Sequence, residues 1–468
     1  MLDEKNRDAT PAAPLSFRDE NGAVRDEFVQ RVSDDIDAGD ADGLKVLVEP
    51  LHAADLGDLL EALHPELRPK LMQLLGDAFD FSALTEVDDA VREEILEQLE
   101  PEVVAEGVRD LESDDAVYIL EDLPKEEQRE ILAQLPATER VALARSLDYP
   151  EQSAGRRTQT EVVAVAPDWT VGQTIDYMRN TVDLPERFFE IYVVDAARHL
   201  LGAVGLDRVL RNPRSTVISE LMDQQRLRVL ATQDQEEVAR MFERYNLVAA
   251  PVVDTNDRLV GVITVDDVVD VIEEEADEDL KALGGVRDEE ISDPVWTIAT
   301  RRFNWLLVNL GTAFLASSVL GLFEGQLQKM VALAVLAPIV ASQGGNAATQ
   351  TMTIAVRALA TKELSDGNAW RVILRETAVG LLNGLAFAVI AGTAAYAWFK
   401  IPSLGLVIGL AMICNLLAGA LGGILIPLTI HRLRLDPAVA SGVFVTTVTD
   451  VVGFFAFLGI ATIWFDLK

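Results

Sequence analysis

The sequence predicts a multidomain fold with an all-α superhelical N domain, an α/β pair of similar units, an acidic connecting helix and an all-α membrane domain of five spans. Two observations support this expectation. The 468-residue chain carries a formal charge of −36, and residues 1–294 hold 29 Lys and Arg against 69 Asp and Glu. Residues 295–468 hold 11 basic and 7 acidic residues, and they contain five long apolar stretches. A single water-soluble globule is therefore excluded.

The composition also limits partners and location. Nucleic acid is not expected as a partner, because phosphate contacts need clustered Lys and Arg. Cys414 is the single cysteine, so neither a disulfide framework nor a cysteine-based metal site is expected. The first residues lack the basic and apolar segments of a signal peptide, which favours a cytoplasmic start. Their polar, Pro-containing composition predicts a disordered tail over 1–27.

The region 28–150 shows a helical pattern with an internal repeat. The segments LLEALHPE, ILEQLEPE, ILEDLPKE and ILAQLPAT begin at residues 59, 95, 119 and 131, and these starts differ by multiples of 12. Each segment predicts a short helix that ends in a proline-bearing turn. Together they predict a small helical solenoid, whose function the pattern does not indicate.

The region 151–273 contains β-type runs such as EIYVVDAARHLLGAV and APVVDTNDRLVGVIT, separated by helical segments. Both halves resemble cystathionine-β-synthase-type (CBS) modules, which pair to form nucleotide- or ion-sensing domains. The second half has the ribose-binding G-x-x-T-x-x-D pattern of that family, and the first half departs from it. The resemblance implies one nucleotide site, and a CBS pair without nucleotide is the alternative. The implied site residues are Ala250, Pro251, Thr264 and Asp267.

An acidic connecting helix is expected over 274–294. Residues 266–293 hold 13 acids against two basic residues, and the segment VVDVIEEEADEDLKAL predicts a helix that breaks at Gly284–Gly285. Like charges four residues apart repel, so divalent cations would stabilise such a helix. A solvated face, or general acidity suited to a salty habitat, is the alternative.

The membrane domain is expected over 295–468. Its apolar stretches are long enough for helices of ~20 residues. The segments between them carry eight Lys and Arg on one side and three on the other, which predicts a cytoplasmic N-terminus and an extracytoplasmic C-terminus in the cell membrane. Pro338, Gly344, Gly345 and Pro427 predict bent or locally unwound helix. The stretches are 303–323, 331–357, 375–399, 404–430 and 438–464.

Asp450 lies near the middle of the fifth stretch, which contains no Lys or Arg. An ionised Asp at the bilayer centre costs roughly 2.5–3.5 kcal/mol, so it should face a cavity or a partner. Helical spacing places Thr446, Thr449 and Asp450 on one stripe, with Asp436 about four turns earlier. This face suits a path for a hard cation such as Mg²⁺, and no spanning His or Cys cluster favours zinc or copper. A carboxyl kept neutral by hydrogen bonds between helices is the alternative.

The order of the domains resembles that of the MgtE family of Mg²⁺ channels, over nearly the whole chain beyond the tail. One departure is at Arg157–Thr158, where that family commonly has an apolar Leu-Met pair. The motifs that carry the resemblance are LHAADLGDLLEAL, DLESDDAVYILEDLP, GVITVDDVVDVIEEEADEDL, PIVASQGGNAATQ and DPAVASGVFVTTVTDVVGF.

The resemblance implies a homodimer with a pore along its axis, lined by the second and fifth spans. It implies that Asp450 holds hydrated Mg²⁺, that Asn346 and Gln350 belong to the GGNxxxQ motif, and that Asp436 lies at the pore mouth. It also implies ATP in the CBS region and Mg²⁺-binding acids that close the channel. The candidates for these acids are Asp114, Asp115, Asp267, Asp270, Glu274, Glu275, Asp277 and Glu278.

We therefore expect a channel for Mg²⁺ influx that is driven by the membrane potential and closed by cytosolic Mg²⁺. A dication that crosses a membrane potential of about 100 mV releases ~4.6 kcal/mol of free energy, so influx needs no ATPase. No GxxxxGK[ST] or HExxH motif occurs, and an enzyme is not expected. The alternatives are a transporter of Co²⁺ or Mn²⁺ and a membrane-anchored CBS sensor of Mg²⁺ or nucleotide that does not conduct.

Overall fold

The chain forms two compact units, up to Glu275 and from Ala276 onward, which are called here the N-terminal unit and the membrane unit. The computed structural model describes residues 17–467 except 122, 182–183, 186, 225–226, 287–288, 290–293 and 365–366. The division between the units falls inside helix α14.

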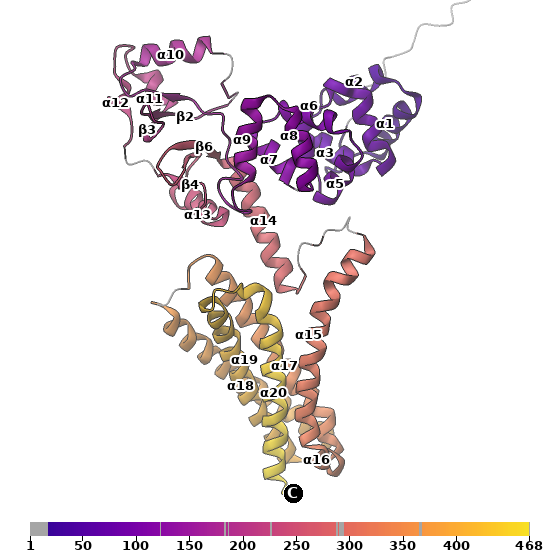
Figure 1. Ribbon diagram of the computed structural model, residues 1–468. Helices are drawn as coiled ribbons and strands as arrows, with labels where there is room; N and C mark the ends of the chain where they lie inside the picture. The colour runs from indigo at the N-terminus through magenta and orange to yellow at the C-terminus, as the bar shows by residue number, and fades with distance from the viewer. Residues whose placement is uncertain are drawn as a thin grey trace, which may run out of the picture. The chain divides into compact units, whose positions relative to one another are not determined.

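The first part of the N-terminal unit is helical, as the sequence predicts (Figure 1). Each of the four repeat segments ends one helix and supplies the proline turn that follows it. Their apolar residues, such as Leu59, Leu60, Ile119 and Leu120, are fully buried in one core. The α-helices are α1 (Asp26–Ala38), α2 (Ala41–Val48), α3 (Ala53–Ala62), α4 (Arg68–Leu75), α5 (Asp89–Glu97), α6 (Pro101–Arg109), α7 (Ser113–Glu121), α8 (Lys125–Gln134) and α9 (Ala137–Leu147), with short 3₁₀ turns at Pro65–Leu67, Gly76–Ala78 and Phe81–Leu84.

The expectation of a disordered tail over 1–27 is wrong for its last part. Residues 17–25 form a turn closed by an antiparallel bridge, and α1 begins directly after it. The Arg18 side chain donates from Nε to Asp55 of α3 at 2.9 Å, and this ion pair fixes the turn on the helical core. Residues 1–16 lie outside the described residues.

Two small sheets of the same design follow in the N-terminal unit. The strand orders are β1-β2-β3 and β4-β5-β6, and in each sheet the first pair is parallel and the second antiparallel. This repetition confirms the predicted CBS pair. The strands are β1 (Ala164–Val165), β2 (Glu190–Val194), β3 (Leu200–Gly205), β4 (Val229–Leu230), β5 (Ala249–Val253) and β6 (Leu259–Thr264), and the helices are α10 (Val171–Asn180), α11 (Leu206–Arg211), α12 (Ile218–Leu221) and α13 (Gln235–Tyr245).

Helix α14 (Val265–Leu283) is the predicted acidic helix, and it starts directly after β6 rather than at residue 274. Asp267 explains this early start, because its Oδ2 accepts from the backbone N–H of Thr264 at 3.2 Å and from its hydroxyl at 2.8 Å. These bonds close the first turn of the helix. The helix ends at the predicted break, where Gly285 has a φ of 74°, in the left-handed region.

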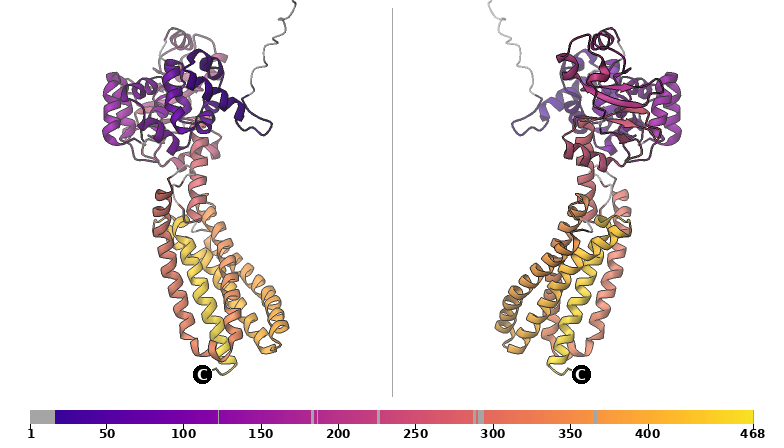
Figure 2. Two further views of the ribbon diagram at one scale, coloured as in Figure 1. Left: turned by 90° about the vertical axis from the view of Figure 1, so that its right-hand side faces the viewer. Right: turned by 90° about the vertical axis from the view of Figure 1, so that its left-hand side faces the viewer.

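Among the residues that the structure describes, the membrane unit contains five helices that are long and apolar enough to cross a membrane, which confirms the predicted spans. In both views of Figure 2 these long helices run side by side. The central helix is α19, which packs against α17, α18 and α20, while α15 packs against α20. The helices are α15 (Val295–Leu322), the short α16 (Glu324–Lys329), α17 (Val331–Ala360), α18 (Ala369–Phe399), α19 (Pro402–Arg432) and α20 (Pro437–Trp464).

The local unwinding expected at the prolines and glycines of the spans is not found. Helix α17 continues through Pro338, and α19 continues through Pro427. A proline removes only one backbone donor, and the remaining hydrogen bonds of these long helices hold the turn. The glycines instead allow close packing, because a Cβ on Gly419 would lie 2.7 Å from the carbonyl oxygen of Gly344.

Candidate ion-binding and regulatory sites

Polar side chains of α17 and α20 form the candidate ion site of the membrane unit. On α17, Asn346 and Gln350 are exposed and lie one turn apart. On α20, Thr446 is exposed, and Thr449 is buried with its hydroxyl bonded back to carbonyl oxygens of its own helix. Asp450 follows Thr449, is half-buried, and has no hydrogen bond or ion pair within the described residues.

Helices α17 and α20 approach each other closely at this level. A Cβ on Gly345 would lie 3.8 Å from Thr449 Oγ1, so the contact is adjacent in sequence to both Asn346 and Asp450. These helices thus present amide, hydroxyl and carboxylate oxygens, the ligand types of hard cations. Asp436 lies elsewhere, at the first turn of α20, where it caps the helix by accepting from the backbone N–H of Ala438 at 2.8 Å.

Three of the candidate regulatory acids lie close together in the N-terminal unit. Asp114 and Asp115 begin α7, and Asp267 begins α14. Burial raises the pKa of Asp114 well above its ordinary value, and the nearby charge of Asp267 raises it further. For the same reasons the pKa of Asp115 rises to about 7, and burial raises that of Asp267 to about 6. Such mutual repulsion favours a bound cation or proton.

The next acids of α14 have different surroundings. Burial and the charge of Glu86 raise the pKa of Asp270 to about 6. Burial also raises the pKa of Glu274, although its two oxygens accept from Arg157 at 3.0 and 2.7 Å. Glu275 accepts from Gln235 Nε2 at 2.9 Å. The carboxylates of Glu274 and Glu275 are therefore already partnered in this arrangement.

The remaining candidate acids, Asp277 and Glu278, belong to the membrane unit. Asp277 forms an ion pair of 2.6 Å with Lys281, one turn further along α14. Within the described residues, no three His, Cys, Asp or Glu side chains are arranged to hold a bare metal ion.

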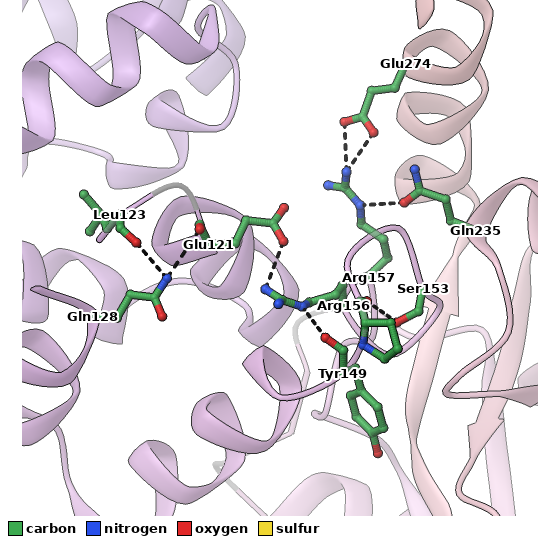
Figure 3. Close-up of polar contacts among 10 residues, drawn as sticks. Glu121, Leu123, Gln128, Tyr149, Ser153, Arg156, Arg157, Gln235 and Glu274 are labelled. Carbon is green, nitrogen blue, oxygen red and sulfur yellow. Dashed lines mark hydrogen bonds and ion pairs between the residues drawn. The ribbon is translucent and has the colours of Figure 1, made fainter. Parts of the chain in front are cut away.

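Two arginines that the sequence analysis did not assign to a site join α7 to the CBS pair (Figure 3). Arg156 donates to the carbonyl oxygen of Tyr149 at 2.9 Å and to Glu121 of α7 at 3.2 Å. Arg157 points the other way, toward Glu274 and Gln235. The signal that could have identified this role is the departure noted at Arg157, where a charge stands in a position expected to be apolar.

Tyr118 of α7 lies close to two guanidinium groups. The Cζ of Arg157 is 4.8 Å from the ring centre, and that of Arg92 is 4.3 Å from it. Burial raises the pKa of Tyr118 to about 12, so the ring is neutral and can attract both cations through its face. These two cation–π contacts form between protein side chains alone and do not involve a metal ion.

The N-terminus of α7 is also bonded to the segment that leads into β1. Glu161 Oε2 accepts from the hydroxyl of Ser113 at 2.8 Å and from its backbone N–H at 3.3 Å. The backbone N–H of Thr160 donates to the same hydroxyl at 2.7 Å. A carboxylate at this position satisfies the free backbone N–H of Ser113 and interacts favourably with the positive end of the helix dipole. Helix α7 is thus held at both ends.

The predicted nucleotide residues lie on β5, at the end of β6 and in the first turn of α14. Ala250 and Pro251 are buried within β5, and the hydroxyl of Thr264 is bonded to Asp267. Thr264 lines both a cleft of about 20 Å³ and an adjoining groove of about 950 Å³. Arg187 and Phe189 line both spaces as well, and they offer a phosphate partner and an aromatic face. Because several acids also line the groove, a phosphate group could bind there only together with a cation that offsets their negative charge.

The fold and these residues together define a class of protein. Five membrane-spanning helices follow a CBS pair and an acidic helical domain, so this is a multi-pass membrane protein with a large polar part. Models of three families match the chain: a divalent cation transporter family, MgtE, at residues 337–460, the MgtE intracellular N domain at 51–152 and the CBS domain at 218–274.

The chain belongs to the MgtE family of magnesium transporters, as the sequence resemblance implied. It is 35% identical over 318 residues to the magnesium transporter MgtE of Enterococcus faecalis, which covers 68% of this chain and 70% of that relative. It is 37% identical over 327 residues to the magnesium transporter MgtE of Thermus thermophilus, covering 68% and 71%. A solved cytosolic domain of the Mg²⁺ channel MgtE in complex with ATP is 30% identical, with a TM-score of 0.47, covering 52% of this chain and 99% of that one.

Proposed function

We propose that this protein is a homodimeric Mg²⁺ channel that admits Mg²⁺ down the membrane potential. Its N-terminal domains lie in the cytoplasm, and its C-terminus lies outside. The observation that carries the proposal is Asp450, a half-buried carboxylate inside a span, which has no hydrogen bond or ion pair among the described residues. Intramembrane acids mark ion pathways by default, because leaving them unpaired is costly.

In this proposal Asp450 attracts hydrated Mg²⁺, and oxygens of Asn346, Gln350, Thr446 and Thr449 contact its water shell. Mg²⁺ gives up its water reluctantly, so a single carboxylate with neutral oxygens suits it. Asp436, at the first turn of α20, attracts cations to the cytoplasmic mouth. The potential supplies ~4.6 kcal/mol per ion at about 100 mV, so influx requires no chemical energy source.

Closure of the channel is assigned to Mg²⁺ bound at the cytosolic acids. The support is the raised pKa values of Asp114, Asp115, Asp267 and Asp270, which reflect first their burial and then repulsion between neighbouring carboxylates. A divalent cation would relieve this repulsion. Binding there favours one arrangement of the domains over another and shifts their populations. Glu274, Glu275, Asp277 and Glu278 continue this acidic surface along α14.

A nucleotide such as ATP is a second proposed ligand, at the groove lined by Thr264, Arg187 and Phe189. Phosphates would pair with the guanidinium of Arg187, and the base would stack on Phe189. Glu161, Asp115 and other acids also line the groove, so the nucleotide would bind together with Mg²⁺. Asp267 would have to leave Thr264 to accept from the ribose.

Influx into proteoliposomes tests the proposed function. The full-length protein is reconstituted with an inside-negative potential, and Mg²⁺ uptake is followed for wild type, Asp450→Asn and Asp450→Ala. Asp466→Asn, at the end of the last span, controls for loss of a charge. We expect a loss of at least about 100-fold in both Asp450 variants, since the ion loses its charged partner.

Each other outcome distinguishes an alternative. Influx that survives in both Asp450 variants would leave a channel whose site lies elsewhere. No wild-type influx, with Mg²⁺ removed from the cytosolic side, would favour the non-conducting sensor. Competition by Co²⁺ and Mn²⁺ in the same assay measures which divalent cation the pathway prefers.

A further inference from the structure

The carboxamide of Asn415 lies inside the membrane unit where three helices meet. Asn415 belongs to α19 and is fully buried, and its Nδ2 donates a 2.7 Å hydrogen bond to the carbonyl oxygen of Val340 on α17. Its Oδ1 is buried too, and it has no hydrogen-bond partner within the described residues. A buried amide oxygen without a donor costs free energy, so stability does not explain why an amide occupies this position.

Glycines of two neighbouring helices make room for this amide. A Cβ on Gly344 of α17 would overlap Asn415 Nδ2, and a Cβ on Gly453 of α20 would lie 2.7 Å from the same atom. The flat carboxamide therefore fills a notch that exists only because both positions lack a side chain. Since the hydrogen bond to Val340 fixes the amide, the amide in turn fixes how closely α17 and α20 approach.

The same two helices carry the residues assigned to the ion pathway. Asn346 lies two residues after Gly344, and Asp450 lies three residues before Gly453. Asn415 itself is fully buried and contributes no exposed surface to that pathway. Any influence on the ion must therefore pass through the spacing of the helices.

We propose that Asn415 is a positioning residue, whose carboxamide sets the distance between α17 and α20 and hence the width of the ion pathway beside Asp450. The inference rests on the proposed function, because the pathway is part of it. A hydrated cation is selected by the fit of its water shell between opposed oxygens, and this fit changes with small displacements of either helix. The amide is retained for this geometry, at the expense of one unsatisfied oxygen.

Two substitutions test the role in conduction. Asn415→Ala removes the amide, and Asn415→Leu replaces it with a side chain of similar size that is not flat and donates no hydrogen bond. Asn383→Ala and Asn383→Leu are matched controls, since Asn383 is an exposed asparagine on α18. The readout is the ratio of Mg²⁺ to Ca²⁺ influx in proteoliposomes, which does not depend on how much protein is folded.

We expect both Asn415 variants to change this ratio by about fivefold or more, because the opposed oxygens are displaced, and the Asn383 variants to leave it within about twofold. Thermal unfolding in detergent accompanies the assay. A merely structural residue would lower the unfolding temperature and total influx together without changing the ratio. That result would overturn the proposal.

A cross-linking measurement tests the spacing independently of conduction. Gly345→Cys and Thr449→Cys are introduced together with Cys414→Ser, because a Cβ at position 345 lies 3.8 Å from Thr449 Oγ1, within the reach of a disulfide. We expect Asn415→Leu to slow oxidation of this pair by about fivefold, since a disulfide tolerates little displacement of its Cα atoms. An unchanged rate would overturn the inference even if the protein conducts. A protein that does not conduct but shows the slower rate would contradict only the proposed function.

Discussion

The junction around α7 in the N-terminal unit and the junction around Asn415 in the membrane unit are held together by opposite means. Around α7, helices are joined by charged side chains: Arg156 with Glu121, and Arg157 with Glu274. Around Asn415, α17, α19 and α20 meet through glycines and one neutral amide. The stability of a junction between charged side chains changes when cations or protons bind, whereas that of a junction between glycines depends only on how well the helices fit together. The molecule thus places its adjustable contacts in the N-terminal unit and its rigid contacts beside the proposed pathway.

The largest expected effect is the loss of stability caused by an extra methyl group among the glycines around Asn415. Gly344→Ala places a Cβ on Asn415, so we expect a loss of about 3 kcal/mol or of folded protein, as overpacking of a close contact predicts. Gly321→Ala, where a Cβ meets nothing within 4 Å, should be neutral. Thermal unfolding in detergent measures both. Equal unfolding temperatures would mean that the junction is not tightly packed.

The next effect concerns the acids of α14. Replacing Glu274, Glu275, Asp277 and Glu278 by their amides should weaken inhibition by cytosolic Mg²⁺ about tenfold, because fewer charges remain to hold the ion. Maximal influx should stay near the wild-type value, since the pathway is unaltered. A matched control changes four other acids, Glu126, Glu127, Glu130 and Glu139, on α8 and α9. Unchanged Mg²⁺ inhibition in the α14 variant would exclude these acids as the sensor.

A smaller effect is expected from a change of pH on the stability of the N-terminal unit. The folded-state pKa values of about 7 for Asp115 and about 6 for Asp267 lie above the ordinary value of 3.8. The folded state therefore binds more protons than the unfolded state between about pH 4 and 7, and its stability falls as pH rises through this window. Without Mg²⁺, we expect proteolysis of the N-terminal unit to be several-fold faster at pH 8 than at pH 6.

Two further measurements sharpen the pH prediction. Adding Mg²⁺ at pH 8 should restore protection, because the cation replaces the protons. Asp115→Asn should reduce the pH dependence, since Asp115 has the higher pKa of these two carboxyl groups and no longer titrates in the variant. A pH dependence that Asp115→Asn leaves intact would show that other groups are responsible.

The smallest effect should follow loss of the Arg157 side chain. Arg157→Ala removes the pair with Glu274 and the contact with Tyr118, and we expect a loss of about 1 kcal/mol, because Glu274 is partly exposed and solvent screens the pair. Arg129→Ala, which removes an exposed pair of 3.9 Å, should change stability by less than about 0.5 kcal/mol. Urea unfolding of the full-length protein compares the two. Equal losses would show that the junction contributes no more than a surface ion pair.

Several features of this protein follow from sequence alone because they depend on neighbours along the chain. Apolar length predicts the five spans, and the repeated apolar pattern with proline turns predicts the helices of the N domain. The break at Gly284–Gly285 is equally local, since only glycine readily adopts the left-handed conformation that ends α14. Asp450 is identifiable for the same reason, as an acid inside an apolar run.

Tertiary structure alone decided the contacts between residues far apart in the chain. The sequence does not predict the ordering of residues 17–27 by Asp55, because this contact depends on a helix that lies elsewhere in the chain. Nothing in the pattern around Arg157 identifies Glu274 as its partner, and nothing around Asn415 identifies Gly344 and Gly453 as its neighbours. The period and apolarity of a segment determine which element it forms, but the packing of one element against another depends on side-chain shapes that meet only after folding.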